Sequence, residues 1–171
     1  MKRLLGFAII IAVFSPSVHA LDDIEMQPAR KRLDLSKDRE RGNTSVREDE
    51  IIYSVKVNSR SFKTLPLVKI KYNIFYEVST LGSTAEPEVK VAKGSHELTD
   101  LQTNKPVEFE TEAIKLAQAA LDGNWYFTNG ASRKVRDKVV GLWFKAFDSE
   151  GNLLGEYVNP SSTSKKQKWA D

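Results

Sequence analysis

The feature that most constrains the fold is an alternation of apolar and polar residues between positions 68 and 76. A period of two places successive side chains on opposite faces of an extended chain, so the pattern predicts a long β-strand with one buried face. Residues 51 to 57 repeat the pattern and predict a second strand. The apolar positions of the two segments are Ile51, Tyr53, Val55, Val57, Val68, Ile70, Tyr72, Ile74 and Tyr76.

A β-hairpin is predicted between Val139 and Val158, where two apolar runs flank residues 148–152. A short loop with glycine near its end suits a type I turn followed by a residue of positive φ. The first run is apolar on both faces, so it is either a central strand with a covered outer face or part of an interface. Strict alternation puts Val140, Leu142, Phe144 and Ala146 on one face, and Val139, Trp143 and Phe147 on the other, candidate interface face.

The remaining segments carry weaker signals. Residues 83–106 are rich in turn and charged residues and predict only a short edge strand. Residues 107–111 predict another half-buried strand, and residues 114–121 fit a strand or a short helix, with a strand to about Leu116 favoured. Six or seven short strands with one hairpin predict an all-β fold, an immunoglobulin-like or fibronectin-like antiparallel β-sandwich with little helix.

The first twenty residues have the pattern of a secretory signal peptide. Lys2 and Arg3 precede an apolar run at residues 4–14, and Val18-His19-Ala20 offers small residues where signal peptidase cleaves. A bilayer needs about 20 apolar residues, so this run predicts a removed signal and no transmembrane anchor after processing. The expected location is the periplasm, the outer membrane surface or the medium.

The domain boundaries follow from these patterns. We expect a signal peptide at 1–20, a charged amino-terminal segment at 21–48, a β-sandwich domain at 49–160 and a disordered basic tail at 161–171. The charged segment fits either a solvated arm or an edge strand built on Ile24, Met26, Leu33 and Leu35.

Charge and cysteine content exclude several functions. Removing Lys2 and Arg3 from 26 basic residues leaves 24 against 23 acidic ones, which argues against nucleic acid as the main partner. The chain has no cysteine, so it has no disulfide, thiol nucleophile, cysteine zinc site or lipid-bearing cysteine. We therefore expect a fold held together by packing alone.

Catalytic equipment is sparse. His96 is the one histidine after the signal segment, and Gly94-Ser95-His96-Glu97 predicts a solvated surface turn. No Gly-x-Ser-x-Gly elbow and no Asp-x-Asp-x-Asp-Gly calcium loop occurs. The alternating Glu108, Glu110 and Glu112 have a spacing that permits a catalytic acid/base pair, as glycosidases use. Alternating acids on a strand are more typical of a solvent-facing surface, and the alternative is pairing with Lys69 and Lys71 across a sheet. We predict a protein that is not an enzyme and that uses no cofactor and no metal.

Three aromatic residues follow the turn at Asp122-Gly123-Asn124. Trp125 and Tyr126 form a candidate glycan platform if they point outward, because sugars stack on exposed aromatic rings. The alternative, favoured from sequence, is that Trp125, Tyr126 and Phe127 plug the end of the sandwich.

Three segments carry a resemblance to a known group of proteins: Tyr53–Ser61, Lys71–Tyr76 and Val140–Asp148. They resemble segments of exported proteins of verrucomicrobial and related bacteria, one of which is an immunoglobulin-like protein encoded beside type IV pilus genes. The resemblance spans residues 46 to 160. It implies an immunoglobulin-like sandwich with a role in pilus assembly or at the cell surface, and it supplies no catalytic residues.

These observations predict a non-enzymatic interaction or structural protein of the cell envelope. It would act through sheet edges and the face that carries Val139, Trp143 and Phe147, because an unpaired edge offers main-chain hydrogen bonds. The expected partners are envelope or pilus-assembly proteins, or a second copy in a homo-oligomer. The alternative is a glycan-binding module that uses Trp125 and Tyr126.

Overall fold

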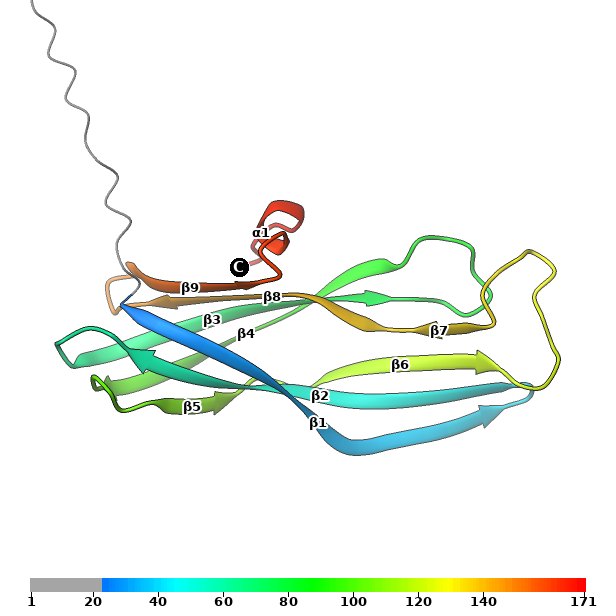
Figure 1. Ribbon diagram of the computed structural model, residues 1–171, viewed down its shortest axis with the longest axis horizontal. Helices are drawn as coiled ribbons and strands as arrows, with labels where there is room; N and C mark the ends of the chain where they lie inside the picture. The colour runs from blue at the N-terminus through cyan, green and yellow to red at the C-terminus, as the bar shows by residue number, and fades with distance from the viewer. Residues whose placement is uncertain (1–22) are drawn as a thin grey trace, which may run out of the picture.

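The protein is a sandwich of two antiparallel β-sheets, as expected (Figure 1). The structure, a computed structural model, describes residues 23–171, so the predicted signal peptide at 1–20 and the first two residues of the predicted charged segment lie outside the described residues. No helix among residues 23–171 is both long and apolar enough to cross a membrane.

The first sheet is built around the 16-residue strand β2. Strand β1 pairs with one edge of β2, and β5 and β6 pair with successive parts of the other edge. Strand β7 adds to β6. The strands are β1 (Ile24–Arg41), β2 (Thr44–Ser59), β5 (Val107–Glu110), β6 (Ile114–Leu121) and β7 (Lys134–Arg136).

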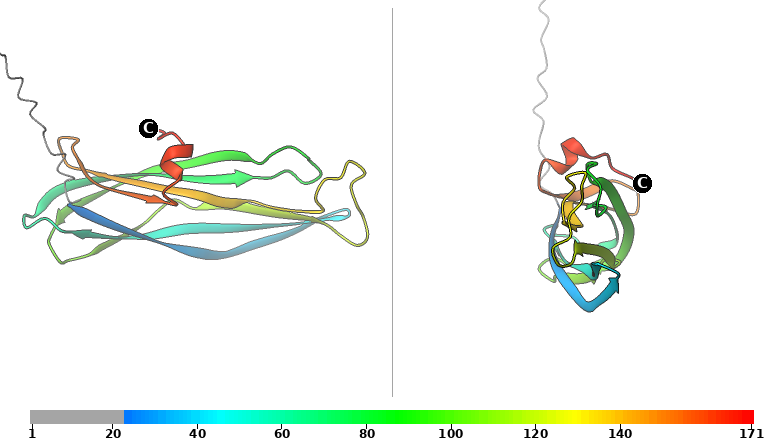
Figure 2. Two further views of the ribbon diagram at one scale, coloured as in Figure 1. Left: turned by 45° about the horizontal axis from the view of Figure 1, so that its top comes forward. Right: turned by 90° about the vertical axis from the view of Figure 1, so that its right-hand side faces the viewer.

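The second sheet has the order β4-β3-β8-β9. With β1-β2-β5/β6 in the facing sheet, this is the arrangement of strands A-B-E and C′-C-F-G in immunoglobulin-like domains. The end-on view in Figure 2 shows the two layers and the narrow cross-section of the elongated molecule. The strands are β3 (Leu65–Val78), β4 (Glu88–Leu101), β8 (Lys138–Phe147) and β9 (Leu153–Asn159).

The apolar faces of β2 and β3 supply the core. Residues 51, 53, 55 and 57 of β2 face residues 68, 70, 72 and 74 of β3, and all of them are buried. Phe144 of β8 is fully buried between the sheets, with its ring centroid 5.6 Å from that of Tyr72. The alternation in the sequence therefore predicted both strands and their inner faces correctly.

The amino-terminal segment forms an edge strand, which decides between the two alternatives for residues 21–48. Strand β1 pairs with β2 along nearly its whole length, with one irregularity between Leu33 and Lys37. Ile24 and Met26 are buried in the core, two residues apart on the inner face. These two apolar side chains anchor the start of a segment that is rich in charged residues.

Strand β4 is a long edge strand of 14 residues where the sequence indicated a short one. His96 lies within this strand, so the predicted surface turn at 94–97 is wrong. The signal was weak because three successive inward positions, Ala92, Gly94 and His96, carry no large aliphatic side chain before Leu98. Gly94 has a steric role, since a Cβ there would collide with the Tyr72 ring.

Residues 114–121 form a strand, not a helix. Between β5 and β6 the chain leaves the ladder at Thr111, whose hydroxyl accepts a hydrogen bond from the Tyr53 amide at 2.9 Å. The amide of Glu112 donates to the Tyr72 hydroxyl at 3.0 Å. Side chains thus satisfy the backbone where regular pairing with β2 is interrupted.

The hairpin predicted at 139–158 is confirmed as β8 and β9. Gly151 has a φ of 88°, the positive value that the turn chemistry requires. Strand β9 ends at Asn159, and the next residue is Pro160, which has no amide hydrogen to donate to the pairing.

The last eleven residues are ordered against the sandwich, so the expectation of a disordered tail at 161–171 is wrong. They contain a short helix, α1 (Thr163–Lys166), and return along the outer face of the second sheet. Thr163 is buried against Gly141, where any Cβ would clash with it. A glycine and a small residue permit this close approach, which composition alone does not reveal.

Candidate functional site

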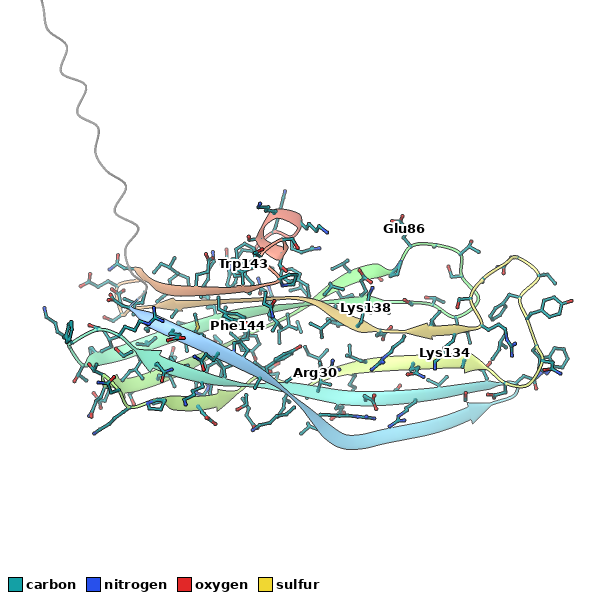
Figure 3. All side chains as sticks on the ribbon, viewed as in Figure 1. Arg30, Glu86, Lys134, Lys138, Trp143 and Phe144 are labelled. Atoms are coloured by element: carbon teal, nitrogen blue, oxygen red, sulfur yellow. The ribbon has the colours of Figure 1, made fainter. Side chains whose placement is uncertain are left out.

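The outer face of the second sheet was the first candidate site, and the structure places only two of its three residues there. Trp143 lies on the predicted outer face. A bulge in β8 shifts the register of its pairing with β3, because Phe75 pairs with Gly141 while the next residue, Tyr76, pairs with Val139. Val139 consequently packs against the core. Figure 3 shows the neighbours Trp143 and Phe144 on opposite sides of β8, with Phe144 between the sheets.

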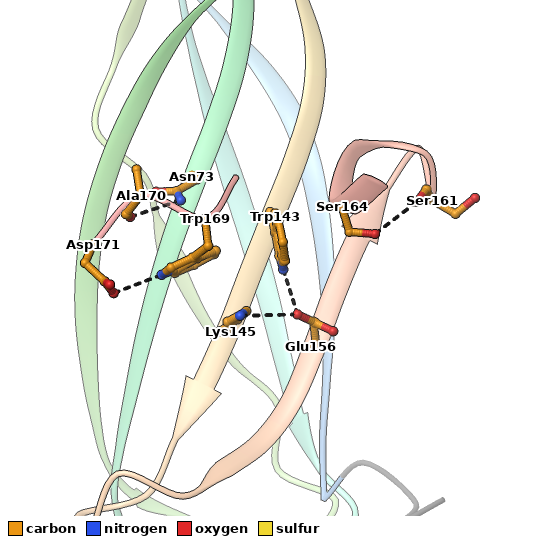
Figure 4. Close-up of polar contacts among 9 residues, drawn as sticks. All are labelled: Asn73, Trp143, Lys145, Glu156, Ser161, Ser164, Trp169, Ala170 and Asp171. Atoms are coloured by element: carbon orange, nitrogen blue, oxygen red, sulfur yellow. Dashed lines mark hydrogen bonds and ion pairs between the residues drawn. The ribbon is translucent and has the colours of Figure 1, made fainter. Parts of the chain in front are cut away.

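The carboxy-terminal segment covers Trp143. The Trp169 ring meets it edge to face, with centroids 5.4 Å apart and planes at 75°. The Trp143 indole donates a hydrogen bond to Glu156 Oε1 at 2.7 Å, and the side chain is 8% exposed (Figure 4). The Lys145 ammonium lies 4.9 Å from the Trp143 ring centroid and 4.7 Å from that of Trp169.

Polar contacts hold the end of this segment over β3 and β4. The Asn73 amide donates to the carbonyl of Ala170 at 3.1 Å, and the Lys93 ammonium donates to the carbonyl of Asp171. Lys71 lies 3.8 Å from the Asp171 carboxylate. The predicted apolar patch is therefore a surface that the chain's own end occupies, with Phe147 half-buried beside it.

The second candidate site lies at one end of the sandwich, in the connection between β6 and β7. Trp125 is 60% exposed and Tyr126 is 74% exposed, so neither plugs the core. Phe127 turns back instead and packs its ring against Gly82 of the β3–β4 connection. The two outward residues line a shallow depression together with Asn124 and Thr128.

Hydrogen bonds tie this connection to its surroundings. The Leu121 amide donates to the carbonyl of Arg133 at 2.9 Å, which closes the base of the loop. The Asn129 side chain donates to the carbonyl of Gly82 at 3.0 Å, and the Asp122 amide donates to that of Asn43 at 2.9 Å. The β1–β2, β3–β4 and β6–β7 connections thus meet at one end of the molecule, and the β8–β9 turn lies at the other end (Figure 1).

Asp137 is a buried residue at the crossing from β7 to β8 that sequence reasoning missed. Its Oδ1 accepts a hydrogen bond from the Ser79 amide at 3.0 Å, and its Oδ2 accepts one from the Ala117 amide at 2.9 Å. One carboxylate therefore joins the end of β3 to β6 in the facing sheet. Asp137 was missed because its neighbours Arg136 and Lys138 are charged, and a run of charged residues is typical of a solvent-exposed segment.

The sequence's titratable candidates occupy structural positions. His96 stacks on Phe109 with ring centroids 4.6 Å apart and an interplanar angle of 5°. Glu110 pairs with Lys31 at 2.9 Å rather than with the lysines of β3, since Lys69 pairs with Glu97 at 3.1 Å. Among residues 23–33 and 42–171, whose side chains the structure describes, no group of three or more His, Cys, Asp or Glu side chains is placed to hold a metal ion.

One exposed aromatic residue was also missed. Phe62, in the connection between β2 and β3, is 99% exposed and lies away from the β6–β7 loop. A single aromatic residue in a polar run gave no periodic signal. It provides a natural reference for the two aromatic residues of the β6–β7 loop.

The fold and its surface features define an immunoglobulin-like β-sandwich with an outward aromatic loop. No protein-family model matches the chain, and no curated protein matches it in sequence. Among solved structures, a crystal structure from Akkermansia muciniphila is similar at 9% identity with a TM-score of 0.32. The match covers 85% of this chain and 77% of the other.

Proposed function

We propose that the protein is a non-enzymatic interaction module of the cell envelope that binds a protein partner through the β6–β7 loop. The observation that carries this proposal is the outward position of Trp125 and Tyr126 on a loop fixed to a rigid sandwich. Large aromatic side chains dominate protein interfaces because they bury much area at a small cost in conformational entropy.

The composition of the loop supports protein recognition. Residues 123–132 contain no charged side chain and consist of glycine, asparagine, serine, threonine, alanine and three aromatic residues. Antibody recognition loops are enriched in the same types, with tyrosine and tryptophan as anchors and small polar residues as adaptable contacts. Phe127 supplies the packing that holds the other two rings outward.

The remaining parts of the proposal rest on the sequence and on the placement of titratable groups. The pattern of residues 1–20 supports export, and the resemblance of residues 46–160 supports a partner among envelope or pilus-assembly proteins. The stacking of His96 and the pairing of Glu110 with Lys31 support a non-catalytic role, because both groups already have structural partners.

The test is capture of a partner from the native envelope, followed by affinity measurements with the purified partner. We expect Trp125→Ala and Tyr126→Ala to raise Kd by tenfold or more, as for aromatic interface anchors that contribute about 2 kcal/mol or more. Phe62→Ala is the matched control, because it removes an even more exposed aromatic ring elsewhere. Equal loss from all three variants, or from none, would overturn the assignment.

Glycan binding is the second candidate, and the depression beside the loop favours it. Two aromatic rings with the Asn124 amide and the Thr128 hydroxyl combine stacking surfaces with hydrogen-bonding groups, as sugar sites require. Purified oligosaccharides separate the two functions. Binding that disappears with Trp125→Ala would assign a glycan ligand, while no binding leaves the protein partner as the proposal.

A further inference from the structure

Strand β4 presents a long unpaired edge. It pairs with β3 from Glu88 to Leu101, and no other strand of residues 23–171 pairs with it. The opposite edge of the same sheet is covered, because Gly155 of β9 lies directly against the backbone of Ile24 in β1. An unpaired row of amides and carbonyls is a template for another strand.

The sequence of β4 is complementary to itself when read antiparallel about Ser95. Side chains directly opposite each other in an antiparallel pair lie on the same face of the sheet. When a strand pairs with its own copy, odd-numbered residues therefore lie opposite odd-numbered ones, and even-numbered residues opposite even-numbered ones. Centred on Ser95, the outer face places Lys93 opposite Glu97 and Val91 opposite Thr99. By symmetry each pair occurs twice.

The inner face agrees with the same register. Ala92 lies opposite Leu98, which extends the core as an apolar pair. Gly94 lies opposite His96, so the imidazole meets no side chain across the pair, and the Tyr72 hydroxyl of the same chain fills the space beside Gly94. The centre of the strand thus carries Ser95 on the outer face and one large side chain, His96, against Gly94 on the inner face.

Two neighbouring registers set like charges opposite each other. Centring the pair on Lys93 sets two ammonium groups against each other, and centring it on Gly94 sets Glu88 against Asp100. Like charges directly opposite destabilise a pair of strands. A pair centred on His96 has no like charges opposite each other, but it lacks the two Lys93–Glu97 pairs. The charges of β4 therefore favour the Ser95 register.

We propose that the protein forms a symmetric homodimer by antiparallel pairing of β4 with β4 of a second copy, with the two-fold axis at Ser95. The two four-stranded sheets become one continuous sheet. Main-chain hydrogen bonds supply the attraction, and Lys93 facing Glu97 of the second copy fixes the register.

Within one copy, Lys93 and Glu97 are exposed and each has one polar partner, since Lys93 donates to the carbonyl of Asp171 and Glu97 pairs with Lys69. Lys69 and Glu97 form an exposed ion pair at 3.1 Å, with 44% and 57% of their side chains exposed. Exposed pairs contribute little and rearrange readily. The Glu97 carboxylate has two oxygens, so it accepts from Lys69 and from Lys93 of the second copy together.

The dimer has a consequence for binding that rests on the proposed function of the aromatic loop. Each β4 begins near the β3–β4 connection, at the end of the sandwich that carries Trp125 and Tyr126 (Figure 1). Antiparallel pairing directs the two loops to opposite poles. A homodimer would therefore bridge two partner molecules instead of binding one molecule twice.

A cysteine-free chain permits a direct test of the register. Ser95→Cys places two thiols across the axis, where opposed residues have Cα atoms about 4.5 to 5.5 Å apart, within disulfide range. We expect mild oxidation to give a covalent dimer. Thr99→Cys is the control, because its two copies lie about 26 Å apart in this register and should not cross-link.

Charge reversal tests the energetic basis by sedimentation equilibrium. We expect Lys93→Glu and Glu97→Lys to raise the dimer Kd by about tenfold or more each, and the double variant to restore it. Lys63→Glu, an equal charge change in the exposed β2–β3 connection, should have no effect. A monomer at all concentrations, or cross-linking of Thr99→Cys as efficient as that of Ser95→Cys, overturns the proposal. Trp125→Ala should leave the dimer intact, so a failure of the proposed loop function can be distinguished from a failure of the proposed dimer.

Discussion

The Trp169 ring packs edge to face against Trp143, and this contact converts an apolar sheet face into a covered one. The ring centroids are 5.4 Å apart, and the Lys145 ammonium lies within 5 Å of both. An exposed tryptophan on β8 would have been an obvious docking point. The chain supplies the covering residue itself, 26 positions further along.

We expect Trp169→Ala to release the end of the chain and to lower the free energy of unfolding by about 1 to 2 kcal/mol. The lost interactions are one aromatic pair and one cation–π contact. Hydrogen exchange should show faster exchange at residues 167–171, and denaturant unfolding should give the energy. Trp125→Ala removes the same side chain from an exposed loop and should change neither result. Unchanged exchange at residues 167–171 in Trp169→Ala would contradict the packing role.

Asp137 should be among the most sensitive positions of the chain. Asp137→Ala leaves the amides of Ser79 and Ala117 without their acceptor, and we expect a loss of about 2 to 4 kcal/mol in unfolding free energy. Chemical denaturation of purified protein measures the loss. Asp137→Asn keeps the shape and one acceptor oxygen, so it should lose less than Asp137→Ala. A loss under about 0.5 kcal/mol in Asp137→Ala would show that the carboxylate does not join the sheets.

Gly94 is required by packing. Gly94→Ala would place a methyl group within the Tyr72 ring, and we expect overpacking to cost about 1 to 3 kcal/mol of stability. Thermal unfolding measures the change. Ser95→Ala, at the next position on the exposed face, should leave the stability of the single sandwich within about 0.5 kcal/mol. Equal stability of Gly94→Ala and the natural protein would mean that the Tyr72 ring moves aside freely.

Periodicity predicted the parts of the fold where one residue in two is large and apolar. The predicted faces are buried in residues 51–57 and 68–76, because apolar side chains alternate regularly with polar ones along both strands. The hairpin was equally predictable from its glycine turn. These local signals were enough for the sandwich architecture.

The errors arose where one residue breaks a local rule. A bulge beside Val140 moved Val139 to the core side, and a single register shift of this kind is invisible to alternation. Strand β4 was underestimated because its inward positions carry small residues and a histidine. The ordered end of the chain depends on Trp169 and Gly141, which lie far apart in sequence.

The candidate sites were predictable only as residue types. Trp125 and Tyr126 were recognised from composition, but their outward position depends on the packing of Phe127 against Gly82, a contact between two loops. Trp143 was recognised as apolar on an outer face, yet its cover lies in a segment that composition assigns to disorder.

The β8–β9 turn should make stability depend on pH through Asp148. Its carboxylate accepts hydrogen bonds from the Asn152 side chain and from the amides of Asn152 and Glu150. These bonds lower the pKa of Asp148 below its ordinary value of 3.8, and the bond from the Asn152 side chain has the largest effect. A lowered pKa in the folded state contributes stability above pH 3.8, and the contribution is lost as pH falls through the lowered value. We expect the natural protein to exceed Asp148→Asn in urea midpoint at pH 6, and the difference to shrink toward about pH 2. Ser149→Ala, in the same turn, should show no such pH-dependent difference, and a constant difference for Asp148→Asn would rule out the carboxylate as its source.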